Sequence, residues 1–241
     1  MNRLALAAQK LLLFKEIRFP VCLLRYYYYR YVACKIRTFE GAQAHLGRNT
    51  LAYNFGNIRH SLVTHDRVLH MIWPLIAVEC VAVNKRHLKT LSIGPRSEGE
   101  LLLIAAHGFA WKNIRGVDLF SYSPRIDVAD MHEMPYAANS FDIVFSGWTL
   151  AYSDDQARAL REMIRVLKPG GFVAFGQGYS SVPNELAGDN WVGGKKRSND
   201  IDEIFAPITA HIDRFYFRHD ITPAMADTGQ RAILAVFSIK K

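Results

Sequence analysis

The sequence predicts an α/β fold with a doubly wound, mostly parallel seven-stranded sheet, preceded by a basic helical extension at the N-terminus. Two observations predict this fold. From residue 89 onward, short β-branched and apolar runs alternate with helical patterns, which is typical of strand–helix–strand units. Before that point the positive charge is concentrated: residues 1–48 carry nine Lys and Arg against two Glu, although the net charge of the whole chain is only +8.

The division of the chain follows from this change in pattern. Residues 1–60 are predicted to form the basic, tyrosine-rich extension, and residues 61–241 the α/β domain. Helices are expected over 3–18, with Pro20 as a natural stop, and over 21–37. Residues 41–57 are punctuated by Gly and Asn and are expected to form a loop. A further helix is expected over 60–83, kinked at Pro74.

The elements of the sheet follow in order. Strands are expected over 89–94, 113–119, 125–130, 141–148, 171–178, 211–221 and 231–240, the last two as an antiparallel pair. Helices are expected over 99–109, 154–167 and 199–208. Gly108 is the expected C-cap of the first of these helices, and Asp154 and Asp155 are the expected N-caps of the second.

Several classes of protein are excluded by composition. The three cysteines have no metal or redox spacing, which favours buried thiols in a reducing compartment. The longest apolar segment, 68–83, is too short to span a bilayer comfortably, and no signal peptide is convincing. We therefore expect a cytoplasmic protein that does not span a membrane and has no metal site.

The most specific feature is the order of motifs over residues 131–176. Met-Pro-Tyr is followed by Asn139-Ser140-Phe141-Asp142, then by Glu162 and the run RVLKPGG. This ordered set closely resembles the second half of class I S-adenosylmethionine-dependent methyltransferases, in particular those of methyltransferase type 11. The resemblance covers residues 88–241. It implies a Rossmann-like fold, methyl transfer and S-adenosyl-L-methionine as the cofactor.

The resemblance also implies where the cofactor binds, beyond the carboxyl ends of the strands. In the family's pattern, Asp118 accepts hydrogen bonds from the ribose hydroxyls. Asp130 accepts one from the adenine amino group, while the Met131 backbone addresses the ring edge. Ser146 and Gly147 lie beside the methyl group, and a glycine there allows close backbone approach. A surface aspartate at 118 and a helix cap at 130 are the alternatives.

The first motif departs from the family's pattern. Ser92 stands where the family has an acid, and Gly94 is followed by Pro95, Arg96 and Glu98, where further glycines are usual. Arg96 is placed to pair with the methionine carboxylate of the cofactor, and Glu98 with its amino group. All five residues are candidates for cofactor binding. The alternative is a loop that has lost its ligand.

A second departure lies between Asp118 and Asp130. Only eleven residues stand where the family has a whole helix, and Pro124 disfavours one there. We expect the N-terminal helices to cover that face of the sheet, as a lid or a dimer surface. Tyr122 is a candidate for part of the adenine contact.

Methyl transfer is an in-line displacement, so positioning and desolvation supply most of the catalysis. A base is needed only when the acceptor must lose a proton, and His132 and Tyr152 are the candidates. Trp148 is a candidate wall for the sulfonium or the acceptor through a cation–π contact. A hydrogen-bonded structural histidine and a core tryptophan are the alternatives.

The acceptor is narrowed by motifs that the sequence lacks. The paired-proline tetrapeptide of amino-methylating nucleic-acid enzymes is replaced by Ser-Gly-Trp-Thr, and all three cysteines precede residue 88. We expect a small-molecule, sugar or lipid-linked acceptor, methylated on oxygen. A non-catalytic scaffold protein and an RNA methyltransferase that uses the basic N-terminus are the alternatives.

Residues 1–48 leave three interpretations open. They could lie peripherally on an anionic membrane, with Leu, Phe and Tyr dipping in. They could bind RNA through tyrosine stacking, which we consider less fitting for this chain. They could also form a solvated cap on the domain, and a homodimer is compatible with each of these.

Overall fold

The computed structural model describes residues 3–39, 66–179 and 198–241. Its seven-stranded sheet consists of β2 (Thr90–Ile93), β3 (Ile114–Asp118), β5 (Ile126–Val128), β6 (Phe141–Gly147), β7 (Leu167–Gly178), β8 (Ile212–His219) and β9 (Ala232–Ile239). The strand order is β5-β3-β2-β6-β7-β9-β8. Neighbours from β5 to β7 run parallel, and β9 is antiparallel to both β7 and β8. The predicted sheet is confirmed, including its antiparallel closing pair.

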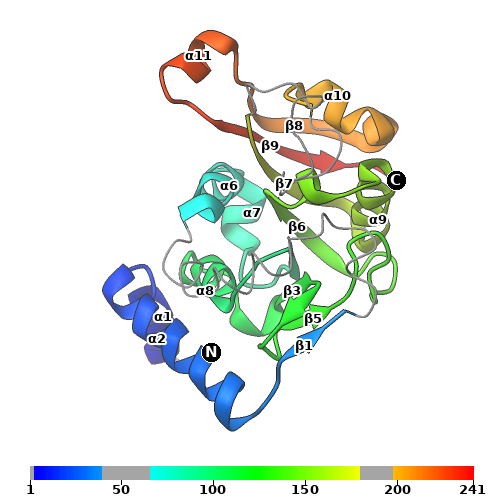
Figure 1. The fold of residues 1–241 in the computed structure, drawn as a ribbon. Helices are drawn as coiled ribbons and strands as arrows, with labels where there is room; N and C mark the ends of the chain where they lie inside the picture. Colours follow the sequence, from blue (N-terminus) through cyan, green and yellow to red (C-terminus); the bar gives the residue numbers. More distant parts are fainter. Residues whose placement is uncertain (1–2, 40–65, 180–197) are drawn as a thin grey trace.

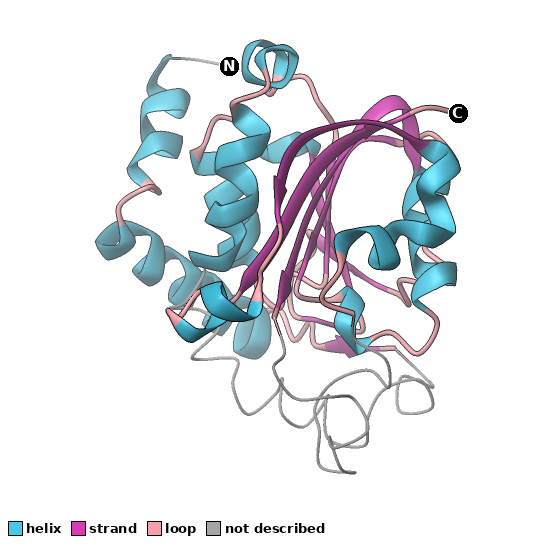
Figure 2. Cartoon of the chain, turned by 90° about the horizontal axis from the view of Figure 1, so that it is seen from above, coloured by secondary structure: helices cyan, strands magenta, loops and turns pink. Residues whose placement is uncertain are grey.

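Helices cover both faces of this sheet (Figures 1 and 2). One face carries α6 (Asp66–Ile76), α7 (Glu79–Asn84) and α8 (Glu98–Ala106); the other carries α9 (Gln156–Val166), α10 (Ile201–Phe205) and the 3-10 helix η5 (Ala206–His211). The connections include the 3-10 helices η2 (Trp111–Asn113) and η3 (Leu150–Tyr152) and the short helix α11 (Pro223–Asp227). The doubly wound arrangement places the sheet between two apolar cores.

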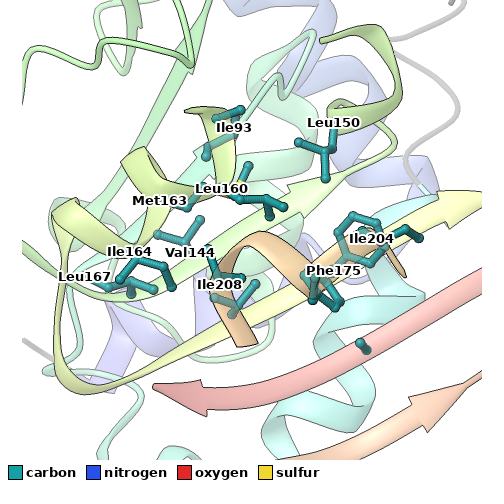
Figure 3. Close-up of a cluster of buried hydrophobic side chains, with 14 of the residues drawn as sticks. Ile93, Val144, Leu150, Leu160, Met163, Ile164, Leu167, Phe175, Ile204 and Ile208 are labelled. Carbon is teal, nitrogen blue, oxygen red and sulfur yellow. The ribbon is translucent and has the colours of Figure 1, made fainter. Parts of the chain in front are cut away.

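The core on the α9 face shows how sequence pattern becomes packing. Leu160, Met163 and Ile164 recur at helical spacing and are buried against the sheet (Figure 3). Phe175 of β7 packs edge-on against Phe205 of α10, with ring centroids 5.0 Å apart. Large apolar side chains therefore fix α9 and α10 on β6 and β7.

Helix α8, on the opposite face, is unusual because eight of its nine residues are buried and only Glu100 is not. A helix that is apolar all round must be covered on its outer side as well as on its sheet side. The cover is the N-terminal extension, which consists of α1 (Arg3–Leu11), α2 (Lys15–Tyr27) and the π-helical turn η1 (Tyr28–Val32). Figure 1 shows α1 and α2 in blue beside α8.

The extension packs beside the short connection between β3 and β5. Between β3 and β5 the structure has the two-residue strand β4 (Phe120–Ser121) and no helix, and β4 pairs with β1 (Arg37–Thr38). Cys22 and Tyr26 of α2 are buried against Leu102 of α8 and against Tyr122, whose ring meets Tyr26 edge-on at 5.1 Å. Tyr122 is fully buried there, so the prediction that it contacts adenine is wrong.

Helix boundaries differ from the prediction at both prolines. Pro20 does not end a helix but lies inside α2, and the chain breaks earlier, between Leu11 and Lys15. The Arg18 guanidinium donates to two carbonyls exposed by that break, 2.9 Å from the Leu12 oxygen. Pro74 likewise stays within α6, and the expected helix over 60–83 is two helices, α6 and α7. The expected loop at 41–57, the start near 60 and the boundary between residues 60 and 61 lie outside the described residues.

A buried ion pair joins the extension to α8. Arg25 Nε lies 2.5 Å from Glu98 Oε2, and Nη2 lies 3.0 Å from Oε1. The hydroxyl of Ser123 donates to the same carboxylate, and the Glu98 N–H donates to the Tyr122 hydroxyl at 3.0 Å. Glu98 is fully buried, so its charge is tolerated only with these partners. The hydrogen bond to Glu98 in turn raises the pKa of the Arg25 guanidinium.

We expect Arg25→Met to lower the free energy of unfolding by about 3 kcal/mol, because it leaves the Glu98 carboxylate buried without its cation. Urea denaturation followed by circular dichroism measures this loss. The double variant Arg25→Met/Glu98→Gln should recover much of it. The control is Arg218→Met, which removes exposed ion pairs with Asp202 and Asp220 and should cost less than about 1 kcal/mol. Equal losses from the two single variants would contradict this role of the Arg25 pair.

Candidate active site

The strand order places the carboxyl ends of β2, β3, β5 and β6 at one edge of the sheet. The chain reverses direction across the sheet between β2 and β6, the position at which open α/β sheets bind ligands. Two non-glycine residues with left-handed backbone follow these strands: Arg96 (φ 43°) after β2 and Trp148 (φ 55°) after β6. That conformation is costly for such residues and persists only where the surroundings hold it. Backbone strain therefore gathers at this edge.

Gly94 begins the loop after β2 in the left-handed conformation, with φ 64°. Its N–H donates to the Val117 carbonyl at 2.8 Å, which ties the loop to the end of β3. A β-carbon at Gly94 would lie 2.4 Å from the Thr149 hydroxyl oxygen, so only glycine fits beneath that side chain. Thr149 is held in place by its hydrogen bond to the Ile93 carbonyl at 2.9 Å. The loop after β6 thus closes over the loop after β2.

Asp118 lies at the end of β3, as predicted. Its Oδ2 accepts the N–H of Arg96 at 3.2 Å, and its Oδ1 accepts the N–H of Phe120 at 3.3 Å. A carboxylate has about four lone-pair positions, so each oxygen keeps capacity for a further donor such as a ribose hydroxyl. Burial raises the pKa of Asp118 to about 6. At neutral pH this group is an ionised acceptor in a place where water solvates it poorly.

Glu100, in the first turn of α8, is not among the residues predicted from the sequence. Burial raises its pKa to about 7, the charge of Arg96 lowers it, that of Asp118 raises it and that of Arg67 of α6 lowers it. We refer to these two cations and two carboxylates, Arg67, Arg96, Glu100 and Asp118, as the charged cluster at the ends of β2 and β3. The sequence signal that could have identified Glu100 is its position in the first turn of the helix after the loop, two residues beyond Glu98.

The other residues of the first motif do not join this cluster. The Glu98 carboxylate binds Arg25 and Ser123, so the prediction that it pairs with the cofactor amino group is wrong. Ser92 and Pro95 are buried, Ser92 within β2 and Pro95 against β3. The helix N-terminus is also partly used: the N–H of Glu98 donates to Tyr122, and that of residue 99 to the Ser97 side chain at 3.3 Å. The anion-binding capacity of the loop therefore depends more on Arg96 than the sequence suggested.

Asp130, His132 and Ser153 form a hydrogen-bonded chain from the end of β5 to the segment after β6. His132 Nδ1 lies 2.5 Å from Asp130 Oδ1, and Nε2 lies 2.7 Å from Ser153 Oγ. His132 and Ser153 are both buried, and the hydrogen bond to Asp130 raises the pKa of His132. Met131, between them, packs against the core on the α9 face. Both ring nitrogens are thus engaged, and Nε2 also lies 3.5 Å from Asp154 Oδ1.

The end of β6 carries one unsatisfied polar group and one close approach. The Ser146 hydroxyl is fully buried and has no hydrogen-bond partner among residues 3–39, 66–179 and 198–241. A β-carbon at Gly147 would lie 2.6 Å from the terminal methyl carbon of Met71 of α6. The neighbour of Gly147 in the structure is thus the end of the Met71 side chain, and the predicted role of Gly147 beside the methyl group stays a prediction.

Trp148 lies across β7. A β-carbon at Gly176 would lie 2.7 Å from its ring, and the Arg67 guanidinium carbon lies 5.5 Å from the ring centroid. The cation over Trp148 in the structure is therefore Arg67, which also belongs to the charged cluster. Tyr152 follows in η3 and is half-buried. The roles of Trp148 and Tyr152 towards a substrate stay predictions.

Comparison with known proteins finds methyltransferases among the similar sequences. Residues 97–175 match the family model described as Methyltransferase domain. The malonyl-[acyl-carrier protein] O-methyltransferase of Halorhodospira halophila is 34% identical over 108 residues, covering 44% of this chain and 32% of the relative. The ubiquinone/menaquinone biosynthesis C-methyltransferase of Idiomarina loihiensis is 30% identical over 122 residues, which cover 44% of this chain and 48% of the relative. The chain thus spans less than half the length of these curated relatives.

A solved structure supports the fold. The S-adenosylmethionine-dependent methyltransferase from Aquifex aeolicus superposes with a TM-score of 0.51 at 15% identity, covering 76% of this chain and 97% of that one. At this identity the likeness concerns the fold alone.

We expect Glu100→Gln to be more stable than the natural protein at pH 8, by about 2 kcal/mol. The pKa of Glu100 is about 7 in the folded chain and about 4.5 in the unfolded chain. The stability that its protonation contributes is therefore complete below pH 4.5 and lost as the pH rises through 7. Urea denaturation at pH 5 and pH 8 should show the advantage of the variant growing with pH.

The control for this measurement is Glu133→Gln, which alters an exposed carboxylate paired with Arg158 and should change stability by less than about 0.5 kcal/mol at either pH. An advantage of Glu100→Gln that is the same at both pH values would contradict the raised pKa.

Proposed function

We propose that this chain is a class I S-adenosylmethionine-dependent methyltransferase and transfers a methyl group to a small-molecule or lipid-linked acceptor. The observation that carries the proposal is the ionised Asp118 carboxylate at the end of β3, bound to the N–H of Arg96 in the loop after β2. The strand order brings this acceptor to the switch point of the sheet.

The residues at this edge fit the chemical groups of S-adenosyl-L-methionine. Asp118 would accept hydrogen bonds from the ribose hydroxyls through its remaining lone pairs. Arg96 would pair with the methionine carboxylate, and Glu100 would take the role expected of Glu98 towards the amino group. The Met131 backbone and Asp130 would address adenine, as the resemblance to the family implies. When bound, the cofactor supplies an electrophilic methyl group on a positively charged sulfur.

The acceptor class is supported by the curated relatives. Their names describe action on malonyl-[acyl-carrier protein] and in ubiquinone/menaquinone biosynthesis, that is, on a carrier-linked acid and on quinones. We favour oxygen as the acceptor atom for this chain. The hydrogen-bonded chain from Ser153 through His132 to Asp130 can take up the proton that a hydroxyl acceptor releases, because the carboxylate stabilises the imidazolium.

A second candidate function is a non-catalytic methyltransferase-like protein. The observations that favour it are Thr149 lying over Gly94 and the use of Glu98 in the ion pair with Arg25. Thr149 limits access to the backbone of the loop after β2, and the ion pair removes a carboxylate that could bind a ligand. A direct measurement of cofactor binding separates this candidate from the first.

We expect the purified chain to bind S-adenosylmethionine and S-adenosylhomocysteine, and Asp118→Asn to weaken binding about a hundredfold, because hydrogen bonds to a charged acceptor contribute about 1.5–3 kcal/mol each. Isothermal titration calorimetry measures both affinities. The affinity of the natural chain should rise as the pH increases through about 6, where Asp118 ionises, and through about 7, where Glu100 ionises; only the rise near pH 6 should vanish in the variant.

The matched control is Asp142→Asn, at the opposite edge of the sheet, where the carboxylate pairs with Lys168 at 2.7 Å. It should leave cofactor affinity unchanged. A folded natural chain that binds neither compound would overturn the enzyme and favour the non-catalytic candidate. Equal losses in the two variants would remove Asp118 from the site.

A further inference from the structure

The extension carries most of the exposed large apolar side chains in the described part of the chain. Ten of the fourteen such residues lie between positions 11 and 36. Leu24 is 71% exposed, Val32 70% and Tyr31 61%. Scattered exposed apolar residues need no explanation, but a concentration of this kind marks an interaction site.

These side chains share one side of the helix. We define the outer face of the extension as Phe14, Ile17, Leu24, Tyr28 and Tyr31. Spacings of seven and four residues keep Ile17, Leu24 and Tyr28 on one stripe of α2 and its C-cap. Phe14 is the N-cap of this helix, and Tyr31 follows in η1. Cys22 and Tyr26, on the other side of α2, pack against α8. The helix is therefore apolar on both sides, and only the inner side is covered within the described residues.

The extension is also strongly basic. Residues 3–39 contain eight basic residues and one acidic residue. Lys10, Lys15 and Lys35 are exposed, and none of these lysines has a salt bridge within the described residues. An exposed apolar helix face accompanied by lysines is the combination found in helices that lie in the plane of a lipid–water interface.

We propose that the outer face of the extension docks on an anionic lipid bilayer. Leu24, Ile17 and Phe14 would enter the boundary between headgroups and acyl chains, and the positive charge of the three lysines would attract the extension to anionic headgroups. Within the described residues no helix is long and apolar enough to cross a membrane, so the proposed contact is with one surface. The proposal does not rest on methyl transfer and can fail or hold independently of it.

Lipid fits this surface better than RNA because four arginines of the extension already have partners within the chain. Arg18 binds the carbonyls of Leu12 and Leu13, Arg25 binds Glu98, and Arg37 binds the carbonyls of Ser123 and Ile126; Arg30 lies over the rings of Tyr26 and Tyr31. RNA recognition depends on free guanidinium groups and stacking rings. Aliphatic side chains such as Leu24 and Val32 gain little from a polyanion but gain much from hydrocarbon.

A second copy of the chain fits less well. An isologous dimer through the outer face would bring two strongly basic extensions together. Like charges in close contact oppose association. Glu16 is the single acidic residue among residues 3–39, and it cannot compensate the eight cations of that segment. An anionic surface removes that repulsion and turns the same charges into attraction.

The test is co-sedimentation of the full chain with two kinds of vesicle: phosphatidylcholine alone, and phosphatidylcholine mixed with phosphatidylglycerol. We expect retention on the mixed vesicles only, weakened by added salt. Leu24→Glu should reduce the binding constant for mixed vesicles at least tenfold, because a leucine that would be buried in the lipid is replaced by a charge. The matched control is Val83→Glu on α7, where the valine is 74% exposed, and it should leave binding unchanged.

The lysines are tested by Lys10→Ser/Lys15→Ser/Lys35→Ser, which should weaken binding to mixed vesicles about a hundredfold, at about fivefold for each lysine. Thermal melting confirms that every variant is folded. No retention on mixed vesicles, or equal loss in Leu24→Glu and Val83→Glu, would overturn the proposal. RNA binding or dimerisation that Leu24→Glu abolishes while vesicle binding is absent would assign the face to that partner instead.

Discussion

The architecture depends on the buried charge of Glu98. A fully desolvated carboxylate must have a cation and donors beside it, and Arg25 and the Ser123 hydroxyl supply them. Satisfying Glu98 brings α2 against α8, covers a helix that has no polar side, and fills the gap left by the missing helix between β3 and β5. The extension is therefore part of the packing of the domain, although it precedes the domain in sequence.

The two carboxylates in the first turn of α8 have different roles, one in the packing of the fold and one at the proposed cofactor site. Glu98 and Glu100 are two residues apart on α8, about 200° around the helix, so they face opposite ways. Glu98 faces the extension, and Glu100 joins Arg96, Arg67 and Asp118 at the edge of the sheet. The loop before them uses a left-handed arginine and a glycine fitted under Thr149. The remodelled motif is thus a compact junction between the fold and the proposed cofactor site.

The sheet was predictable because each strand and helix has a local pattern, and the motifs of residues 131–176 fix their order. Asp118 and Gly147 were predictable for the same reason, since strand ends are readable in the sequence. The role of Glu98 was not, because its partner Arg25 is 73 positions away and nothing local distinguishes Glu98 from Glu100. The engagement of His132 by Ser153 depends similarly on two loops meeting in space. One clue was available: an all-apolar LLLIAA helix requires a cover on both sides.

The distance in sequence between α2 and α8 has a consequence for the order of folding. The extension is made before α8, so its packing surface on that helix does not exist until residues 98–106 have been synthesised. At a synthesis rate of about 5–20 residues per second, the 73 residues separating Arg25 from Glu98 take roughly 4–15 s to emerge. During that interval both apolar sides of α2 face solvent or a helper protein. The extension therefore cannot take its final place until α8 has been made.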